Sequence, residues 1–158
     1  MAIHDTPDGG PGDTLGEFER IIGKTQYMVL ATADEEGLPW ASPVWFASSD
    51  GRAFYWVSKP EARHSRNLAV RPELGIAIFD SAQPAGTGEG AYVSAVAGLV
   101  PDDEIDAGIE ICSAASVRAG LESWSRADVE PPARLRLYRA TARERFILGP
   151  GDQRVPVP

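Results

Sequence analysis

The most informative stretch of the sequence reads Tyr55-Trp56-Val57-Ser58-Lys59-Pro60-Glu61-Ala62-Arg63-His64-Ser65-Arg66-Asn67-Leu68. Its first residues are aromatic and β-branched, which is typical of a strand, and the remainder is basic with a helical spacing. Although the chain has a net charge of −8, five of its 15 Lys and Arg residues fall close together here: Arg52, Lys59, Arg63, Arg66 and Arg71. This local positive charge indicates a site for a small anion.

The first half of the stretch is expected to be a strand over residues 53–58. Alternation places Phe54, Trp56 and Ser58 on one face of this strand. Tyr55 and Val57 fall on the other face. Because both sets are mostly large and apolar, we expect both faces to be largely buried.

The second half of the stretch predicts a helix with a phosphate site at its start. Residues 58–61 fit a capping box, so the helix is expected over Lys59–Val70, ending before a proline. Free N–H groups at a helix start attract phosphate, and Ser58, Lys59, Arg63 and His64 would add a hydroxyl and cationic donors. The alternative is a solvated basic face on a surface helix. The charges alone leave both interpretations open.

The rest of the chain supplies five further strands and two further helices. Periodicity predicts a helix from Thr14 to Lys24, then strands over 27–33, 39–47 and 53–58 in an antiparallel meander. Strands are also expected over 74–79, 91–100 and 134–148, with a helix from Pro101 through Cys112. Segment 81–90 is expected to be a loop, and 113–132 stays undecided, with a helix around 117–124 as one alternative. These elements predict a mainly β (α+β) fold, a six-stranded antiparallel barrel with peripheral helices.

Length and composition favour one domain over 14–148, between a disordered leader at 1–13 and a loose tail at 149–158. The acidic balance argues against a nucleic-acid partner. The single Cys112 has no second Cys or His nearby for a metal site, so an inert core thiol is expected. Neither a signal peptide nor a membrane span is apparent, so a cytoplasmic protein without a membrane partner is expected.

Five segments taken in order, 42–46, 54–58, 63–68, 71–73 and 76–80, resemble the pyridoxamine 5′-phosphate oxidase-like family of split-barrel flavoproteins. The resemblance implies a six-stranded split barrel, a homodimer, and FMN in a groove at the dimer interface. It implies that strand 41–46 runs along the flavin and that Arg63 and His64 hold the phosphate. Trp124 is a further candidate, which would reach the flavin from the second subunit. The implied cofactor-binding residues are Ala41, Ser42, Pro43, Val44, Trp45, Phe46, Val57, Ser58, Lys59, Arg63, His64 and Trp124.

The resemblance makes an FMN-dependent oxidoreductase the leading hypothesis, with a small-molecule substrate and NAD(P)H as a possible reductant. No catalytic side chain and no metal is implied, because the flavin carries the chemistry. The pyridoxamine phosphate oxidases proper tend to have Arg at the place of Ala41 and Lys at the place of His64, which argues against pyridoxal phosphate synthesis. The alternatives are an F420-dependent reductase on the same fold, a non-catalytic flavin or small-molecule binding module, and a structural dimer with an empty groove.

Overall fold

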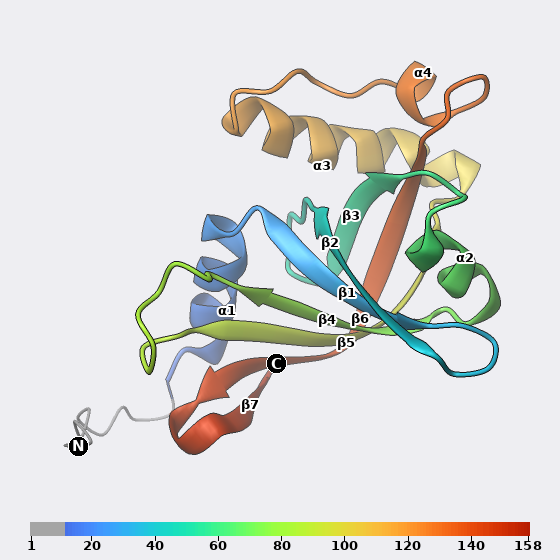
Figure 1. Cartoon of the computed structure of the whole chain (residues 1–158). Coiled ribbons are helices and arrows are strands. Elements are labelled where there is room, and N and C mark those ends of the chain that lie inside the picture. Colours follow the sequence, from blue (N-terminus) through green and yellow to red (C-terminus); the bar gives the residue numbers. More distant parts are fainter. Residues whose placement is uncertain (1–11) are drawn as a thin grey trace.

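A curled antiparallel sheet forms the centre of the molecule (Figure 1). The computed structural model describes residues 12–158. Six strands lie in the order β2-β1-β4-β5-β6-β3, and β7 pairs with the far end of β6. The strands are β1 (Tyr27–Ala33), β2 (Pro39–Trp45), β3 (Ala53–Ser58), β4 (Glu73–Phe79), β5 (Gly90–Leu99), β6 (Arg136–Gly149) and β7 (Gln153–Val157). The predicted mainly β, six-stranded split barrel is therefore confirmed.

The helices lie at the periphery of this half-barrel (Figure 1). They are α1 (Thr14–Lys24), α2 (Arg63–Val70), α3 (Ile105–Arg118) and α4 (Arg126–Val129), with short 3₁₀ turns at Asp102–Glu104 and Pro150–Asp152. The helix expected around 117–124 is absent, because α3 ends at Arg118 and Gly120 follows with a φ of 76°. A left-handed residue at this position ends a helix.

The strands next to each other in the sequence, β2 and β3, lie at the two ends of the sheet. The expected meander is therefore correct for β1 with β2 and wrong for β2 with β3, which pairs along its whole length with β6. One isolated bridge, between Ala47 and Tyr55, joins the two ends. Because pairing stops there, an open seam runs between β2 and β3.

Two apolar cores fill the two sides of the sheet. The first core lies inside the curl and contains Phe54 and Trp56, with Phe18 from α1 and Leu68 from α2. The second core lies under α3 and α4 and contains Tyr55. Because β3 sends alternate side chains into both cores, the predicted burial of both its faces is confirmed.

The helix after β3 begins four residues later than the sequence predicts. Residues 59–62 instead form a turn, in which the Ala62 N–H donates to the Lys59 carbonyl at 3.1 Å. Pro60 suits the second position of such a turn because its φ is fixed. Ala62 is the N-cap of α2 and has no side chain that can cap, so the expected capping box is wrong.

The segment expected to be a loose tail, 149–158, is ordered as strand β7. Gly151 and Asp152 both have a positive φ, which turns the chain back so that β7 pairs with β6. Val157 is buried in the first core, and this burial holds the strand in place. The expected leader at 1–13 lies outside the described residues except for its last two positions, of which Asp13 caps α1.

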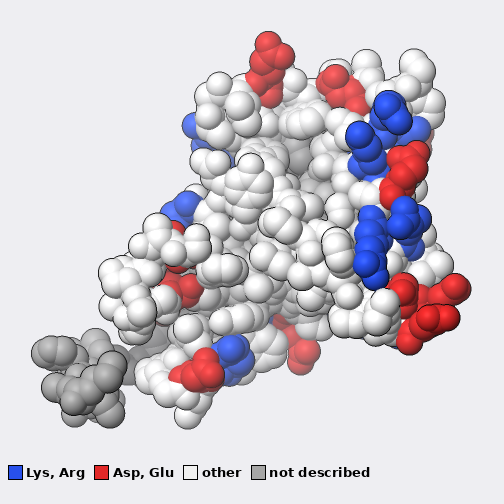
Figure 2. Space-filling view, viewed as in Figure 1, with Lys and Arg blue, Asp and Glu red and all other residues white. Residues whose placement is uncertain are grey.

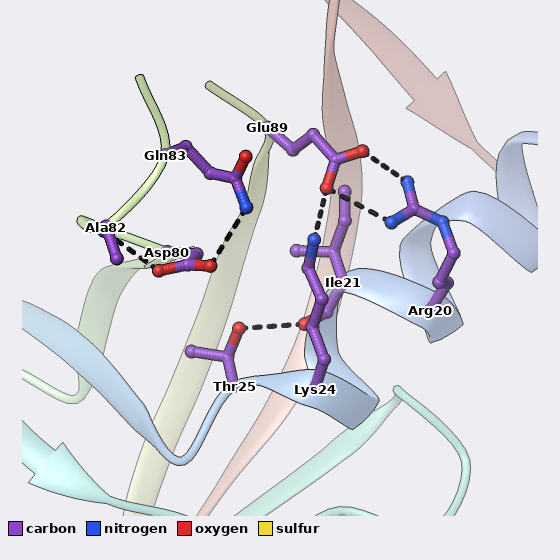
Figure 3. A network of polar contacts seen from close by, with 8 residues as sticks. All are labelled: Arg20, Ile21, Lys24, Thr25, Asp80, Ala82, Gln83 and Glu89. Atoms are coloured by element: carbon purple, nitrogen blue, oxygen red, sulfur yellow. Dashed lines mark hydrogen bonds and ion pairs between the residues drawn. The ribbon is translucent and has the colours of Figure 1, made fainter. Parts of the chain in front are cut away.

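The loop between β4 and β5 is fastened at both ends (Figure 3). At its start, Asp80 accepts hydrogen bonds from the Ala82 N–H and the Gln83 amide. At its end, the Glu89 carboxylate accepts from Arg20, with a 2.6 Å contact, and from Lys24. These cationic partners lower the pKa of Glu89 to about 2.

Glu89→Gln should therefore loosen this loop at neutral pH, since the neutral amide forms no ion pair with α1. We expect amide hydrogen exchange over 82–90 to quicken by about two- to fivefold, the scale of a partly exposed ion pair. In the parent chain the same loosening should develop as the pH falls from about 4.5 toward 2, because the carboxylate then gains a proton. Glu122→Gln, which removes an exposed carboxylate without an ion pair among residues 12–158, is the control. Equal exchange in both variants would contradict the anchoring role.

Candidate functional site

The side chain of His64 spans the seam between β2 and β3. Its Nε2 lies 2.8 Å from Ser58 Oγ at the end of β3. Its Nδ1 lies 3.2 Å from Ser42 Oγ on β2. The seam is thus held at one end by the Ala47–Tyr55 bridge and at the other by this Ser42–His64–Ser58 chain.

His64 is buried, with 8% of its surface exposed, and burial lowers the pKa of its imidazole. No carboxylate lies among its partners. The ring is therefore neutral at pH 7, with one nitrogen donating to a serine hydroxyl and the other accepting from one. A neutral imidazole at this position can gain a proton when an anion arrives beside it.

The start of α2 offers further donors at the same place. No side chain caps this helix, so the N–H groups of its first turn have no intrahelical or side-chain acceptor. Ser65, in that turn, is buried, and its hydroxyl has no partner among the described residues. Helix N–H groups are a donor type that an oxyanion requires.

Arg63 is the first residue of α2, and its guanidinium carries no ion pair among residues 12–158. It lies over the ring of Trp40, with 4.4 Å between the guanidinium carbon and the ring centroid. Of the neighbouring arginines, Arg66 donates to the Glu61 carbonyl and Arg71 to the carbonyls at 34 and 35. Arg63 is thus the arginine available beside the serine hydroxyls, and Lys59 in the turn after β3 is a second cation without an ion pair among residues 12–158.

Trp40 is the member of this cluster that sequence reasoning missed. Its Nε1 donates to Ser42 Oγ at 2.9 Å, and its ring holds Arg63. Strand alternation puts Trp40 and Ser42 on the same face of β2, which was the signal that could have found it.

The structure brings together Ser42, Ser58, Arg63 and His64 from the predicted set. The other predicted residues lie in the two cores, on the outer face of the sheet, in the turn after β3, or beside α3. Val44 and Phe46 pack on the first core, and Trp45 and Val57 on the second. Ala41 and Pro43 point to the outer face of the sheet, and Lys59 is exposed in the turn after β3.

Trp124 lies apart from the cluster within the chain. Its Nε1 donates to Ser116 Oγ at 3.0 Å, and its backbone exchanges hydrogen bonds with the Ser113 hydroxyl. The ring packs against the second core. Within one chain, Trp124 therefore fastens the segment after α3 to that helix.

The free edge of β2 runs beside the cluster. β2 is the last strand of the sheet path, and within residues 12–158 it pairs with β1 alone. Alternate peptide groups along such an edge have no strand partner. Backbone donors and acceptors of residues 39–45 are therefore available next to Ser42.

The surface around α2 is strongly charged. Figure 2 shows basic side chains along the side of the molecule where α2 lies, with acidic side chains at the β1–β2 turn below them. Between the two lies a hollow of about 270 Å³, lined by Asp34, Glu35, Arg63, Arg66, Asn67 and Val70. An anion at the start of α2 would meet the basic part of this surface.

A second hollow, of about 460 Å³, lies on the outer face of the sheet. It is lined mainly by small and apolar residues, among them Val29, Ala31, Gly75, Ala77 and Phe146. Ala31 and Gly75 are exposed and face each other across β1 and β4. An apolar, flat face of this kind is typical of a protein interface.

A metal site, a reactive cysteine and a membrane-spanning helix were each sought among residues 12–158. No group of three or more His, Cys, Asp or Glu side chains over residues 12–158 could hold a metal ion. Cys112 is buried, and burial raises the pKa of its thiol to about 12, which agrees with an inert core thiol. Over the same residues, no helix combines the length and the apolar character needed to cross a bilayer.

Solved structures with the same fold include two from heme biology. A heme-binding protein from Mycobacterium smegmatis aligns with a TM-score of 0.74 and 24% identity, over 95% of this chain and 59% of that one. HutZ, the heme storage protein of Vibrio cholerae, aligns with a TM-score of 0.65 and 21% identity, over 86% of this chain and 95% of its own. The present chain thus spans about three fifths of the mycobacterial protein. At this identity, the likeness establishes the fold alone.

ChuZ from Campylobacter jejuni has the fold as well, with a TM-score of 0.71 and 16% identity over 90% of this chain and 58% of its own. A comparison with curated proteins finds no match. The family model described as pyridoxamine 5′-phosphate oxidase matches residues 15–147, which is most of the chain. The fold, the extent of this match and the five segments in their order lead to one conclusion: the chain belongs to the pyridoxamine 5′-phosphate oxidase family.

Proposed function

We propose that this protein binds FMN, with the phosphate held at the start of α2. The observation that carries the proposal is the donor set there: two hydroxyls linked through His64, the unpaired guanidinium of Arg63, and uncapped helix N–H groups. A phosphate monoester needs several donors and a positive charge around it, and this set provides both.

The remainder of the cofactor would follow the free edge of β2. The peptide groups beside Ser42, Pro43 and Val44 can donate to and accept from the polar atoms of a ribityl chain and a flavin ring. Bound flavin supplies hydride or electron transfer. The chain itself would position the cofactor and balance the charge of its phosphate.

The active form in this proposal is a homodimer with an oxidoreductase activity on a small molecule, and with NAD(P)H as a reductant. The apolar outer face of the sheet, which carries Ala41 and Pro43 as well as the larger hollow, is the surface that a second copy would cover. Residues on both faces of β2 would then contribute to the same groove. Trp124 of the second copy is the proposed contact from across the interface.

Heme is the second candidate ligand, because two proteins of the same fold bind or store it. Heme iron is usually held by His, Cys, Met or Tyr. His64 has both ring nitrogens engaged, Cys112 is a buried thiol, and Met28 is fully buried. Of the tyrosines, Tyr27 is well exposed, and Tyr92 lies under the Arg154 guanidinium. Among residues 12–158, which do not include His4, this supply of ligands favours FMN over heme.

The deciding experiment is a set of parallel titrations of the purified full chain with FMN, riboflavin, F420 and heme, followed by absorbance and by tryptophan fluorescence. We expect saturable binding of FMN and at least tenfold weaker binding of riboflavin, since riboflavin lacks the phosphate. Tight heme binding without FMN binding would overturn the proposal. Preference for F420 would assign the same site to the deazaflavin. Reduction of the bound flavin by NADH or NADPH separates an enzyme from a binding module.

The affinity for FMN should fall as the pH rises, because His64 is neutral in the free protein and a phosphate dianion beside it would raise its pKa. Binding then takes up a proton. We expect the dissociation constant to increase about tenfold between about pH 6.5 and 8.5, where the phosphate is mainly a dianion. His64→Gln should keep the hydrogen bonds to serine and show a flat profile, as should riboflavin with the parent chain. An unchanged slope in His64→Gln would contradict the role given to His64.

A further inference from the structure

The Trp40 side chain has unusual surroundings for such a large aromatic group. It is 42% exposed, yet both its ring face and its N–H are engaged. The ring lies under the Arg63 guanidinium at 4.4 Å. The indole N–H donates to Ser42 Oγ at 2.9 Å, and the same hydroxyl contacts His64 Nδ1.

These contacts separate Trp40 from the core and from the outer face of the sheet. It belongs to neither apolar core. Alternation along β2 puts Trp40 on the face of Ser42, whereas Ala41 and Pro43 occupy the outer face. An exposed tryptophan that touches two members of one polar cluster has a role connected with that cluster.

The surroundings of Arg63 explain what the ring contributes. The guanidinium lines the same hollow as Asp34 and Glu35, two carboxylates at the β1–β2 turn. Without a competing contact, a long cationic side chain beside two carboxylates would turn toward them. A guanidinium over an indole ring gains a cation–π contact, and indole is the best aromatic partner for this. The Trp40 ring thus holds the Arg63 guanidinium near Ser42 and away from the two carboxylates.

We propose that Trp40 is a positioning residue of the anion site: it aims Arg63 at the start of α2 and fixes the Ser42 hydroxyl. The inference rests on the proposed FMN site and adds to it the side chain that orders its charge. Trp40 touches neither the reacting atoms nor, in this proposal, the phosphate. Its effect is exerted through Arg63 and Ser42.

The contact itself can be tested in the ligand-free protein. The Arg63 Nε–Hε signal in a ¹⁵N–¹H spectrum, identified by its loss in Arg63→Lys, should be displaced by the ring current of Trp40. In Trp40→Leu it should return to the position of the other exposed arginines. An unchanged signal would show that the ring does not hold Arg63 in solution, and this outcome overturns the proposal whether or not FMN binds.

The effect on the ligand is tested with FMN against riboflavin. Trp40→Leu should weaken FMN about five- to tenfold, since a cation–π contact and a neutral hydrogen bond are each worth a factor of a few. Riboflavin should be unaffected. Trp40→Phe retains a ring face and loses the N–H, so it should recover the part of the loss that acts through Arg63. In an Arg63→Ala background only the contact with Ser42 remains to be lost, so Trp40→Leu should weaken FMN clearly less than it does in the parent chain.

Two further comparisons keep the outcomes distinct. Phe79→Leu removes an aromatic ring that is 51% exposed at the other end of the sheet, and it should leave both affinities unchanged. Equal weakening of FMN and riboflavin by Trp40→Leu would mean that the ring contacts the cofactor directly, which overturns the positioning role. If the parent chain binds neither ligand, the proposed function fails, while the spectrum of Arg63 still decides whether Trp40 holds it.

Discussion

Replacing Arg63 by alanine is expected to weaken FMN binding by about ten- to a hundredfold. A hydrogen bond to a charged group contributes about 1.5–3 kcal/mol, and Arg63 is the cation in the cluster that has no other ion partner among residues 12–158. Riboflavin should bind to the variant and to the parent chain alike, because it has no phosphate. The measurement is fluorescence titration of both ligands with both proteins.

Arg118→Ala is the matched control. Arg118 is also an exposed arginine on a helix, but it lies at the end of α3, away from α2 (Figure 1). The two variants lose the same charge, so a general electrostatic effect would appear in both. Equal FMN affinities for them would remove Arg63 from the site. Both variants should remain folded, which thermal unfolding checks, since neither side chain forms an ion pair among residues 12–158.

Ala31→Glu is expected to convert the proposed homodimer into a monomer. Ala31 is exposed in the centre of the larger hollow, so the single chain accommodates the longer side chain without a clash. In a dimer the new carboxylate would be buried against apolar atoms without a partner. Burial of an unpaired charge costs several kcal/mol, which corresponds to a hundredfold or greater loss of self-association. Light scattering over a range of protein concentrations measures the change.

Ala114→Glu, an exposed position on α3, is the control for the added charge. It should leave the mass in solution unchanged. If the FMN groove is completed by the second copy, Ala31→Glu should also weaken FMN, in step with the loss of dimer. A variant that stays dimeric would move the interface to another face of the molecule.

The sequence predicted the elements of the fold more accurately than their pairing. Alternation along 53–58 identified two buried faces, because a strand between two cores has large apolar side chains at every position. The pairing of β3 with β6 could not be seen in the same way. Short turns favour pairing with the next strand, whereas the closure of the curl depends on contacts that form only when the whole sheet is assembled.

The C-terminal strand shows another limit of sequence reasoning. Gly, Pro and Asp near residue 150 are typical of a loose tail, although a Gly-Asp pair with positive φ is also what a tight hairpin requires. Two valines after the turn would have indicated the strand. Its stability comes from Val157 in the first core, a contact that composition cannot reveal.

The candidate site was found in outline because charge and helix position are visible in a sequence. Ser58, Arg63 and His64 fall within one short segment, so their proximity follows from the chain itself. Trp40 comes from a distant strand, and its contact with Arg63 depends on how β2 lies against α2. A resemblance to a family indicates shared positions, and Trp40 was not among them.

Because β3 pairs with β6 and not with β2, the open seam also affects how the chain folds during synthesis. Strand β3 is made early on the ribosome, but its partner β6 begins only at Arg136, so Ser58 waits for most of the remaining chain before it pairs. Contacts this distant in sequence slow folding and leave an unpaired strand edge exposed in the meantime. The aromatic run in β3 is therefore an aggregation-prone segment of the nascent protein until β6 has been made.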